Sequence, residues 1–247
     1  MGLKAMVFAA GMGTRLRPLT DNKPKALIEV GGKPLIAHVM ERLVQAGFDE
    51  LVVNVHHCAD RLIGYLKEWN AHRVTIHISD ERNLLLDTGG GIKHVRTLFT
   101  DNTPFLIHNT DILSNLDLQA FYRAHLNRKS AATLLVSRRN TSRYLLFDAS
   151  DRLQGWINRK SGETKPLNKP IRMEQLTALA FNGIHVFSPT LFVEMEHESD
   201  RFSIIDFYLS CCDRYDIHAY RDDDSDWLDV GKIEVLEQAE AWCKRHG

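Results

Sequence analysis

The chain begins with a short apolar run that opens into a glycine-containing loop, and this feature constrains the fold more than any other. The run spans residues 5–10, and Gly11 and Gly13 follow it directly. A buried strand that ends in such a loop indicates phosphate binding, because glycine lets the backbone bend tightly and brings N–H groups close to an anion. Arg15 and Lys25 add positive charge. We therefore predict a polyphosphate site at the end of the first strand.

Two better-known phosphate loops do not fit this pattern. A Walker A loop requires a second glycine five residues after the first, but the chain has Leu16 there, directly after Arg15. A dinucleotide-binding loop requires a third glycine or alanine three residues after Gly13, where Leu16 stands. The loop therefore belongs to a third type.

The whole stretch 7–28, including Pro18 and Pro24 that stiffen the loop, resembles the signature of the sugar-1-phosphate nucleotidyltransferases. Enzymes of this family join a nucleoside triphosphate to a sugar 1-phosphate and release pyrophosphate. The resemblance implies one domain over 1–247, with a nucleotide-binding half at about 1–115 and a sugar-binding half at 116–247. It also implies an α/β fold of the nucleotide-diphospho-sugar transferase type, with a Rossmann-like, mixed and mainly parallel sheet flanked by helices.

Composition argues against large polyanionic partners. The 247 residues include 31 Lys and Arg against 32 Asp and Glu, so no overall field attracts nucleic acid or an anionic membrane. No segment approaches the roughly 18 uninterrupted apolar residues of a membrane helix. The four cysteines have no C-x-x-C spacing, which argues against a zinc site. We expect a cytoplasmic protein that acts on small charged metabolites, as a monomer or a homodimer.

Apolar periodicity alternates between strand and helix through the first half, as in a parallel sheet covered by helices. The elements predicted there are helices at 35–44, 62–69 and 88–99 and strands at 51–55, 74–78 and 104–108. Strands are also predicted at 131–137, 144–148, 153–157 and 179–187, as a mixed or antiparallel extension. The polar segment 158–175 is interpreted as a flap over the sugar, an oligomer contact or a plain surface loop.

Two aspartates are candidate metal ligands. Asp111 follows a predicted strand, at the carboxyl end where α/β sheets place ligands, and Asp229 precedes the last helix. Both match the family's metal-binding positions, which implies Mg²⁺, an ion that takes one or two carboxylates plus phosphates and water. Thr110 replaces the glycine that many relatives have, and it would either crowd the metal or add a hydroxyl contact.

The resemblance implies roles for the two cations of the loop. Arg15 would hold the departing pyrophosphate, and Lys25 would lie between the α-phosphate and the sugar phosphate. A phosphate monoester is itself nucleophilic, so the absence of a Ser-His or Cys-His constellation agrees with direct in-line displacement. The predicted catalytic residues are Arg15, Lys25, Asp111 and Asp229.

The base and the sugar are harder to assign. The loop and a glycine-rich helix start should flank the base, with the predicted nucleotide contacts at Ala9, Ala10, Gly11, Gly13, Thr14, Arg15, Glu81, Gly89 and Gly90. The segment 79–92 looks most like small bacterial enzymes that make UDP-N-acetylmuramic acid for the cell wall. A carboxylate such as Glu81 would accept a hydrogen bond from uracil or from guanine, so mannose- and heptose-1-phosphate guanylyltransferases remain alternatives.

On the sugar side, residues 181–185 resemble the family's strand that lies against the hexose. This makes Asn182 and Gly183 candidate sugar contacts, and Asp206 either braces that pocket or stabilises a helix start. Two further alternatives stay open: a cytidylyltransferase for phosphocholine or a polyol phosphate, and a non-catalytic nucleotide-sugar-binding regulator. The chain retains all four predicted catalytic residues, Arg15, Lys25, Asp111 and Asp229, which a non-catalytic regulator would have no chemical reason to keep.

Overall fold

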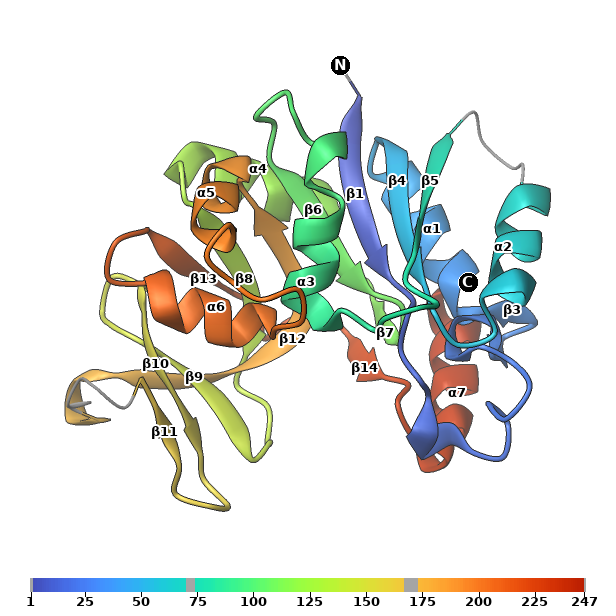
Figure 1. Cartoon of the computed structure of the whole chain (residues 1–247). Coiled ribbons are helices and arrows are strands. Elements are labelled where there is room, and N and C mark those ends of the chain that lie inside the picture. Colours follow the sequence, from blue (N-terminus) through green and yellow to red (C-terminus); the bar gives the residue numbers. More distant parts are fainter. Residues whose placement is uncertain (1, 70–73, 167–172, 247) are drawn as a thin grey trace. The chain divides into compact units, whose positions relative to one another are not determined.

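A computed structural model describes residues 2–69, 74–166 and 173–246 of the chain. It divides into two compact units, whose segments are interleaved along the sequence (Figure 1). The first unit comprises Met1–Leu85, Phe105–Gln119 and Ser225–Gly247. The second comprises Leu86–Pro104 and Ala120–Asp224. The C-terminal segment therefore returns to the unit that contains the first strand.

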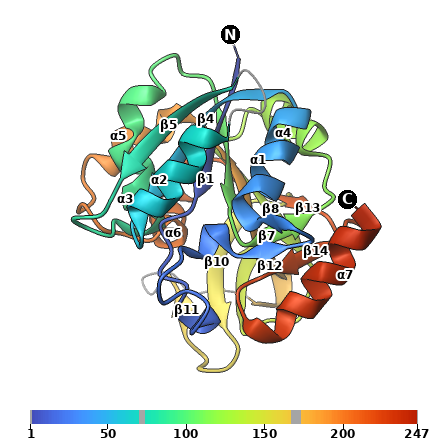
Figure 2. The same ribbon diagram turned by 90° about the vertical axis from the view of Figure 1, so that its right-hand side faces the viewer.

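The first unit is built on a parallel sheet in the order β6-β1-β4-β5. Its strands are β1 (Leu3–Phe8), β4 (Phe48–Val55), β5 (Thr75–Asp80) and β6 (Phe105–Asn109). The central strands are continuous apolar runs because they are buried on both faces. Helices α1 (Leu35–Gln45) and α2 (Ala59–Glu68) pack against β4 (Figure 2).

A set of small elements completes the first unit. They are η1 (Thr14–Leu16), η2 (Lys25–Leu27), β2 (Glu29–Val30), β3 (Lys33–Pro34), β7 (Ile112–Ser114), β14 (Trp227–Asp229), η6 (Ile233–Val235) and α7 (Leu236–His246). One hydrophobic cluster joins several of them, in which Leu16 of the loop and Val230 after β14 pack with Trp242 of α7. The last helix thereby anchors both the loop and the segment that carries Asp229.

The second unit contains a mixed sheet in which β9 and β8 flank β12. Its strands are β8 (Ala132–Ser137), β9 (Arg143–Phe147), β10 (Leu153–Asn158), β11 (Thr164–Lys165), β12 (Thr177–Phe187) and β13 (Ile217–Arg221). Only β13 with β8 is parallel among the described ladders of this unit. The helical elements are α3 (Asp87–His94), η3 (Arg96–Leu98), α4 (Leu118–Arg128, in this unit from Ala120), η4 (Met173–Gln175), η5 (Pro189–Leu191), α5 (Phe192–Met195) and α6 (Ile204–Cys211).

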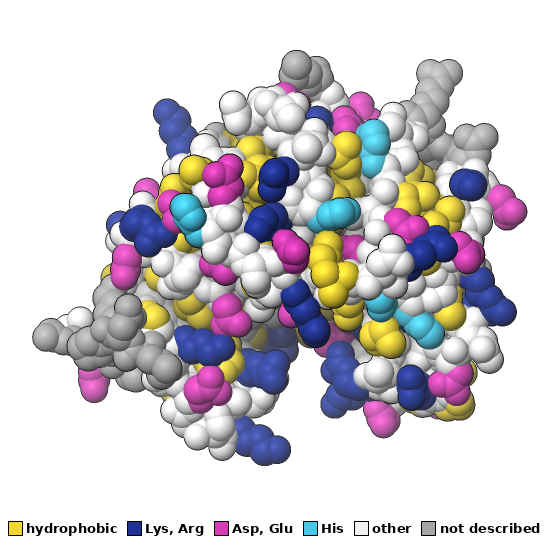
Figure 3. Space-filling model, viewed as in Figure 1, with side chains coloured by type: hydrophobic (Ala, Val, Ile, Leu, Met, Phe, Trp, Pro, Cys, Tyr) yellow, Lys and Arg dark blue, Asp and Glu magenta, His cyan; other side chains and the backbone are white. Residues whose placement is uncertain are grey.

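The predicted α/β class with a Rossmann-like mixed sheet is confirmed, as is the antiparallel extension in the second half. The sequence interpretation missed α4 and β13. Within the segment 158–175, β11 pairs with β10 as a hairpin, and residues 167–172 lie outside the described part. Acidic and basic side chains are interspersed across the face drawn in Figure 3. In the described residues, no helix is both long and apolar enough to cross a membrane.

A buried histidine on β12 is expected to make the protein less stable in mild acid. Burial lowers the pKa of His185 from 6.5 to about 3, and neither ring nitrogen has a hydrogen-bond partner among the described residues. In the unfolded chain the His185 ring takes up a proton near pH 6.5, whereas in the folded chain it stays neutral down to about pH 3. The contribution of this neutral ring to the free energy of unfolding is therefore fully present above pH 6.5 and is lost as the pH drops toward 3. The loss should reach about 2 kcal/mol at pH 5.

The variant His185→Phe keeps a ring edge-on to Tyr208, whose centroid lies 5.8 Å away. Urea unfolding at pH 7.5 and pH 5 should show a smaller stability difference in the variant than in the natural chain. An identical pH dependence in both proteins would contradict the assignment.

Candidate active site

The two predicted metal ligands lie side by side in the first unit because β14 pairs antiparallel with β7 (Figure 1). In this ladder Asp229 stands opposite Ile112, and the Val230 N–H donates to the Asp111 carbonyl oxygen at 2.7 Å. Backbone pairing of two short strands from distant parts of the chain thus brings Asp111 and Asp229 to neighbouring backbone positions. Two acidic side chains at the carboxyl end of a parallel sheet form a suitable site for a hard cation.

Lys25 reaches the same place from the N-terminal loop. The turn η2 follows Pro24, and it is closed by the Leu27 N–H, which donates to the Pro24 carbonyl oxygen at 2.9 Å. This turn directs the Lys25 Nζ to Asp111 Oδ2, to which it donates a hydrogen bond. The two side chains are only 13% and 21% exposed, so their charges interact more strongly than a surface pair would.

The glycine loop is shaped by Gly13 and Thr20. Gly13 has a positive φ of 63°, and its carbonyl oxygen accepts a hydrogen bond from the Thr20 hydroxyl at 2.8 Å. Gly11 and Thr14 are exposed, and nothing lies within 4 Å of the place where a Cβ on Gly11 would stand. The loop therefore presents open backbone, as close approach of a phosphate requires.

Arg15 lies against the segment that carries Asp229. A Cβ built on Gly231 would lie 2.6 Å from Arg15 Nη2 and also 2.6 Å from Asp229 Oδ1. A side chain at this position would displace the guanidinium or the carboxylate. All four predicted catalytic residues are therefore brought together within the first unit.

A buried amide connects the start of the loop to Glu81. Asn54 Oδ1 accepts hydrogen bonds from the Ala9 and Ala10 N–H groups at 2.7 and 3.2 Å, and Asn54 Nδ2 donates to Glu81 Oε1 at 2.8 Å. Asn54 and Glu81 are each 3% exposed. Sequence reasoning missed Asn54, although a lone polar residue in the apolar run 51–55 is a usable signal. The base-binding role of Glu81 stays a prediction.

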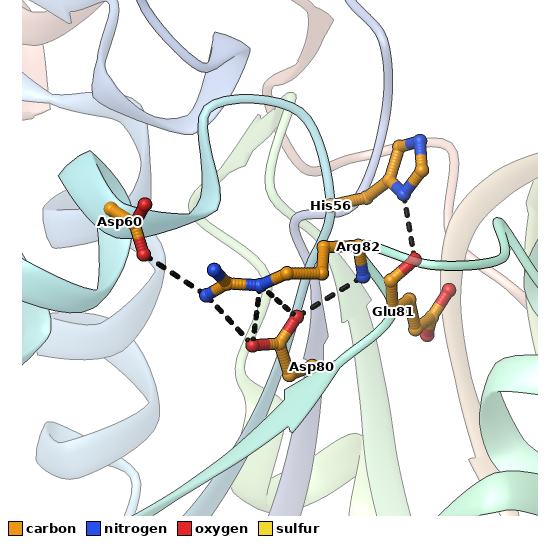
Figure 4. Close-up of polar contacts among 5 residues, drawn as sticks. All are labelled: His56, Asp60, Asp80, Glu81 and Arg82. Carbon is orange, nitrogen blue, oxygen red and sulfur yellow. Dashed lines mark hydrogen bonds and ion pairs between the residues drawn. The ribbon is translucent and has the colours of Figure 1, made fainter.

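The turn that carries Glu81 is held from both sides (Figure 4). Arg82 pairs with Asp80 at 2.8 Å and with Asp60 at 3.0 Å, and the bond from Arg82 lowers the pKa of Asp80. His56 Nδ1 lies 2.7 Å from the Glu81 carbonyl oxygen, so this nitrogen carries the donated proton. These contacts fix the backbone at residue 81 and therefore the direction of its carboxylate.

Thr110, beside Asp111, bonds to the protein backbone. Its hydroxyl and its N–H both donate to the Phe8 carbonyl oxygen, at the end of β1, and the residue is 4% exposed. The hydroxyl thus helps to join the ends of β1 and β6, and the two effects predicted for this threonine stay predictions. The neighbouring Asp111 remains partly exposed.

Gly89 and Gly90 belong to the second unit, where their small size serves protein packing. Both N–H groups lie within hydrogen-bond distance of the Phe202 carbonyl oxygen, at 2.9 and 3.3 Å. A Cβ on Gly89 would meet the Phe202 ring at 2.3 Å, and one on Gly90 would meet the Asp200 carbonyl oxygen at 2.1 Å. These glycines let α3 approach the segment that precedes α6. Their predicted contact with the base stays a prediction.

Two helical glycines should respond oppositely to alanine. Gly90→Ala is expected to destabilise the protein by about 2–3 kcal/mol, because the new methyl group meets rigid backbone. Gly64→Ala in α2 should stabilise it by about 0.5–1 kcal/mol, because nothing lies within 4 Å of its Cβ position and alanine favours the helix. Urea unfolding measures both, and equal effects at the two sites would contradict this explanation.

The predicted sugar contacts also lie in the second unit. Asn182 is 2% exposed, and Gly183 has a φ of 77° where the β12–β8 register shifts. Asp206, in the first turn of α6, donates its N–H to the Ser203 hydroxyl at 3.4 Å and accepts from Lys165 Nζ at 2.8 Å. Asp206 therefore lies at a helix start and also lines an open pocket, described below. Sequence reasoning did not identify Lys165.

Comparisons with known proteins identify chains that are similar to this one. Residues 4–245 match the family model described as nucleotidyl transferase. The chain is 50% identical to the N-acetylmuramate alpha-1-phosphate uridylyltransferase of Caulobacter vibrioides over 109 residues, which cover 43% of this chain and 45% of that protein. It is 29% identical to the mannose-1-phosphate guanyltransferase of Schizosaccharomyces pombe over 236 residues, 93% of this chain and 61% of that protein.

The chain thus spans less than two thirds of the length of these curated relatives. Among solved structures, UDP-glucose pyrophosphorylase from Acinetobacter baumanii is similar with a TM-score of 0.78. That similarity covers 97% of this chain and 92% of the other at 17% identity, which establishes a shared fold alone.

Proposed function

Because the chain belongs to the nucleotidyl transferase family, we propose that it joins a nucleoside triphosphate to a sugar 1-phosphate in a Mg²⁺-dependent reaction. The observation that carries the proposal is the pairing of β7 with β14, which holds Asp111 beside Asp229 while Lys25 bonds to Asp111. Two carboxylates that can hold a divalent cation, together with the positive charge of the Lys25 ammonium group, can offset the repulsion between two anionic phosphate substrates. The products are a nucleotide sugar and pyrophosphate.

The donor set fits Mg²⁺. Asp111 and Asp229 offer hard carboxylate oxygens, and the part of the chain that the structure describes has no group of three or more His, Cys, Asp or Glu side chains that could hold a metal ion. Mg²⁺ commonly takes one or two carboxylates and completes its shell with substrate phosphates and water. When bound, the ion supplies positive charge that offsets the repulsion between the two phosphate substrates.

The protein's own groups position the reactants. An oxygen of the sugar phosphate attacks the α-phosphorus, and the bond from that phosphorus to the bridging oxygen breaks, so that pyrophosphate leaves with the electron pair. We assign Lys25 to the α-phosphate and the sugar phosphate, and Arg15 to the departing pyrophosphate. Both act by charge and placement, and no protein nucleophile is required.

For the substrates we propose UTP and N-acetylmuramate 1-phosphate. The support is the identity to a protein of that name, which is higher than the identity to the guanyltransferase although it covers a shorter stretch. GTP with mannose or heptose 1-phosphate, and CTP with phosphocholine, are the alternatives. The reaction would serve cell-wall nucleotide-sugar synthesis in the cytoplasm, with the enzyme as a monomer or a homodimer.

Pyrophosphate release tests the proposal directly. The chain is incubated with Mg²⁺ and each of UTP, GTP, CTP, ATP and dTTP, against a panel of sugar 1-phosphates that includes N-acetylmuramate, mannose and heptose compounds. UTP with N-acetylmuramate 1-phosphate should be the productive pair. Another productive pair would reassign the substrates, and nucleotide binding without pyrophosphate from any pair would favour a non-catalytic regulator.

Removing the Arg15 guanidinium should weaken use of the triphosphate. We expect Arg15→Ala to raise the KM for the triphosphate by about 10- to 100-fold, because a charge-assisted contact to phosphate oxygens is lost. Steady-state kinetics with varied triphosphate measure this change. Arg17→Ala is the matched control, since Arg17 is exposed in the same loop and pairs with Asp21 at 3.5 Å. A rise of equal size in the control would contradict the role of Arg15.

A further inference from the structure

An open pocket of about 480 Å³ lies wholly within the second unit. Tyr144, Trp156 and Phe181 contribute aromatic surface to it, which suits the apolar face of a sugar ring. Among the residues that the structure describes, its charged lining consists of Arg139, Arg143, Lys165, Glu163 and Asp206. Cations therefore outnumber carboxylates in a pocket that otherwise resembles a carbohydrate site.

The protein holds the Arg139 side chain of this pocket in a fixed direction. Its Nε donates to Asn182 Oδ1 at 3.0 Å, and its Nη2 donates to the Phe181 carbonyl oxygen at 2.8 Å. Both acceptors lie on β12, so these two bonds orient the guanidinium against that strand. A guanidinium oriented in advance loses less side-chain entropy when a ligand binds.

The buried Asn182 amide has no ambiguity of orientation. Arginine can only donate, so the oxygen of Asn182 faces Arg139 and the nitrogen faces Ser137, whose Oγ lies 3.0 Å from Nδ2. The strand itself is adapted here, because Gly183 has a φ of 77° at the register shift between Phe181 and His185. Such irregularities commonly re-aim a side chain beside a functional site. Asn182 is thus a positioning residue for Arg139.

The other two cations of the pocket are arranged differently. Lys165 Nζ is 2.8 Å from Asp206 Oδ1 and lies over the Trp156 ring, 5.3 Å from its centroid, so its charge is balanced by a carboxylate. Arg143 is exposed at the start of β9. Arg139 differs from both in that two hydrogen bonds to β12 orient its guanidinium in the pocket.

We infer that Arg139, positioned by Asn182, recognises a carboxylate substituent on the sugar and so selects acidic sugar 1-phosphates over neutral ones. The planar guanidinium matches a carboxylate in a two-bond arrangement, which gives geometric selectivity as well as charge. This inference rests on the proposed function, because it assigns the substrate class of the same reaction.

Equilibrium binding and turnover together test the inference. The probes are N-acetylmuramate 1-phosphate and N-acetylglucosamine 1-phosphate, which differ only in the acidic lactyl ether, with Mg²⁺ and a non-hydrolysable UTP analogue present. The natural chain should bind the acidic compound at least about 10-fold more tightly. Arg139→Gln should weaken that binding by about 10- to 100-fold and change binding of the neutral compound by no more than about twofold.

Asn182→Asp provides a second variant with a different expectation. A carboxylate at this position would keep Arg139 in place but neutralise it, so the preference for the acidic compound should disappear although the pocket is retained. Arg128→Gln is the matched control, since Arg128 bonds to the Ser150 carbonyl oxygen and is not among the residues that line the pocket. In Arg128→Gln, the ratio of the affinity for the acidic compound to that for the neutral compound should equal the ratio in the natural chain.

The outcomes separate the two proposals. The role of Arg139 would be overturned if Arg139→Gln weakened the binding of both sugar phosphates equally. It would also be overturned if the natural chain bound neither compound or bound both with the same affinity. Pyrophosphate release is measured on the same samples with UTP in place of the analogue. A chain that discriminates between the ligands through Arg139 yet releases no pyrophosphate would contradict the proposed reaction and leave the carboxylate recognition supported.

Discussion

Asp111→Asn is expected to lower kcat by about 10³-fold or more, because it removes one of two carboxylates that hold the metal charge at the reacting phosphates. The amide has nearly the same volume as the carboxylate, and the backbone pairing of β7 with β14 does not depend on the side chain. The fold should therefore persist. Turnover at saturating substrates measures the loss, and circular dichroism with urea unfolding verifies the fold.

Asp49→Asn is the matched control for this variant. Asp49 is exposed near the amino end of β4, whereas Asp111 follows the carboxyl end of β6 in the same parallel sheet. The control changes the net charge identically and should leave kcat unchanged. Undiminished turnover in Asp111→Asn, or an equal loss in Asp49→Asn, would contradict the metal assignment.

The loop and its two cations could be predicted because their signal is local. Glycine at 13 is required by a positive φ of 63°, and Lys25 is directed by a turn that begins at the adjacent Pro24. The strands and helices of the first half could also be predicted, since each carries its own periodicity. By contrast, the distance between Asp111 and Asp229 depends on β7 and β14, strands of three residues each. Elements so short have no periodicity to detect.

The structural roles of several residues could be seen only from the folded structure, because their partners are distant in the sequence. Asn54 matters because it joins the loop to Glu81, and neither partner is near it in the sequence. Gly90 suggested an approach to a ligand, yet its Cβ would meet the Asp200 carbonyl oxygen of the protein itself. A close backbone approach has the same sequence signal whether the neighbour is a ligand or another segment. Long-range packing therefore decides what such a glycine is for.

Lys25→Ala is expected to lower kcat by about 10²- to 10³-fold, because the lysine ammonium stabilises charge that develops on the transferring phosphate. The KM for the triphosphate should change much less, since the proposed contact strengthens as the reaction proceeds. Lys25→Arg should recover only part of the rate, because a guanidinium cannot occupy the place of the compact ammonium bonded to Asp111. Pre-steady-state rates of pyrophosphate formation isolate the chemical step.

Lys23→Ala distinguishes a positioned charge from the general charge of the loop. Lys23 lies two residues away, is 38% exposed and pairs with Glu29 at 3.0 Å, whereas Lys25 is 13% exposed and bonds to Asp111. If the lysines of the loop only attracted anions, Lys23→Ala and Lys25→Ala would lower kcat to a similar extent. High salt would then screen these charges and remove the difference in kcat between each variant and the natural chain. If Lys25 acts at the reacting phosphate, Lys23→Ala should retain full kcat and the defect of Lys25→Ala should persist in salt. If both variants lose rate and high salt removes the loss, Lys25 only attracts the anionic substrates to the loop and does not act at the reacting phosphate.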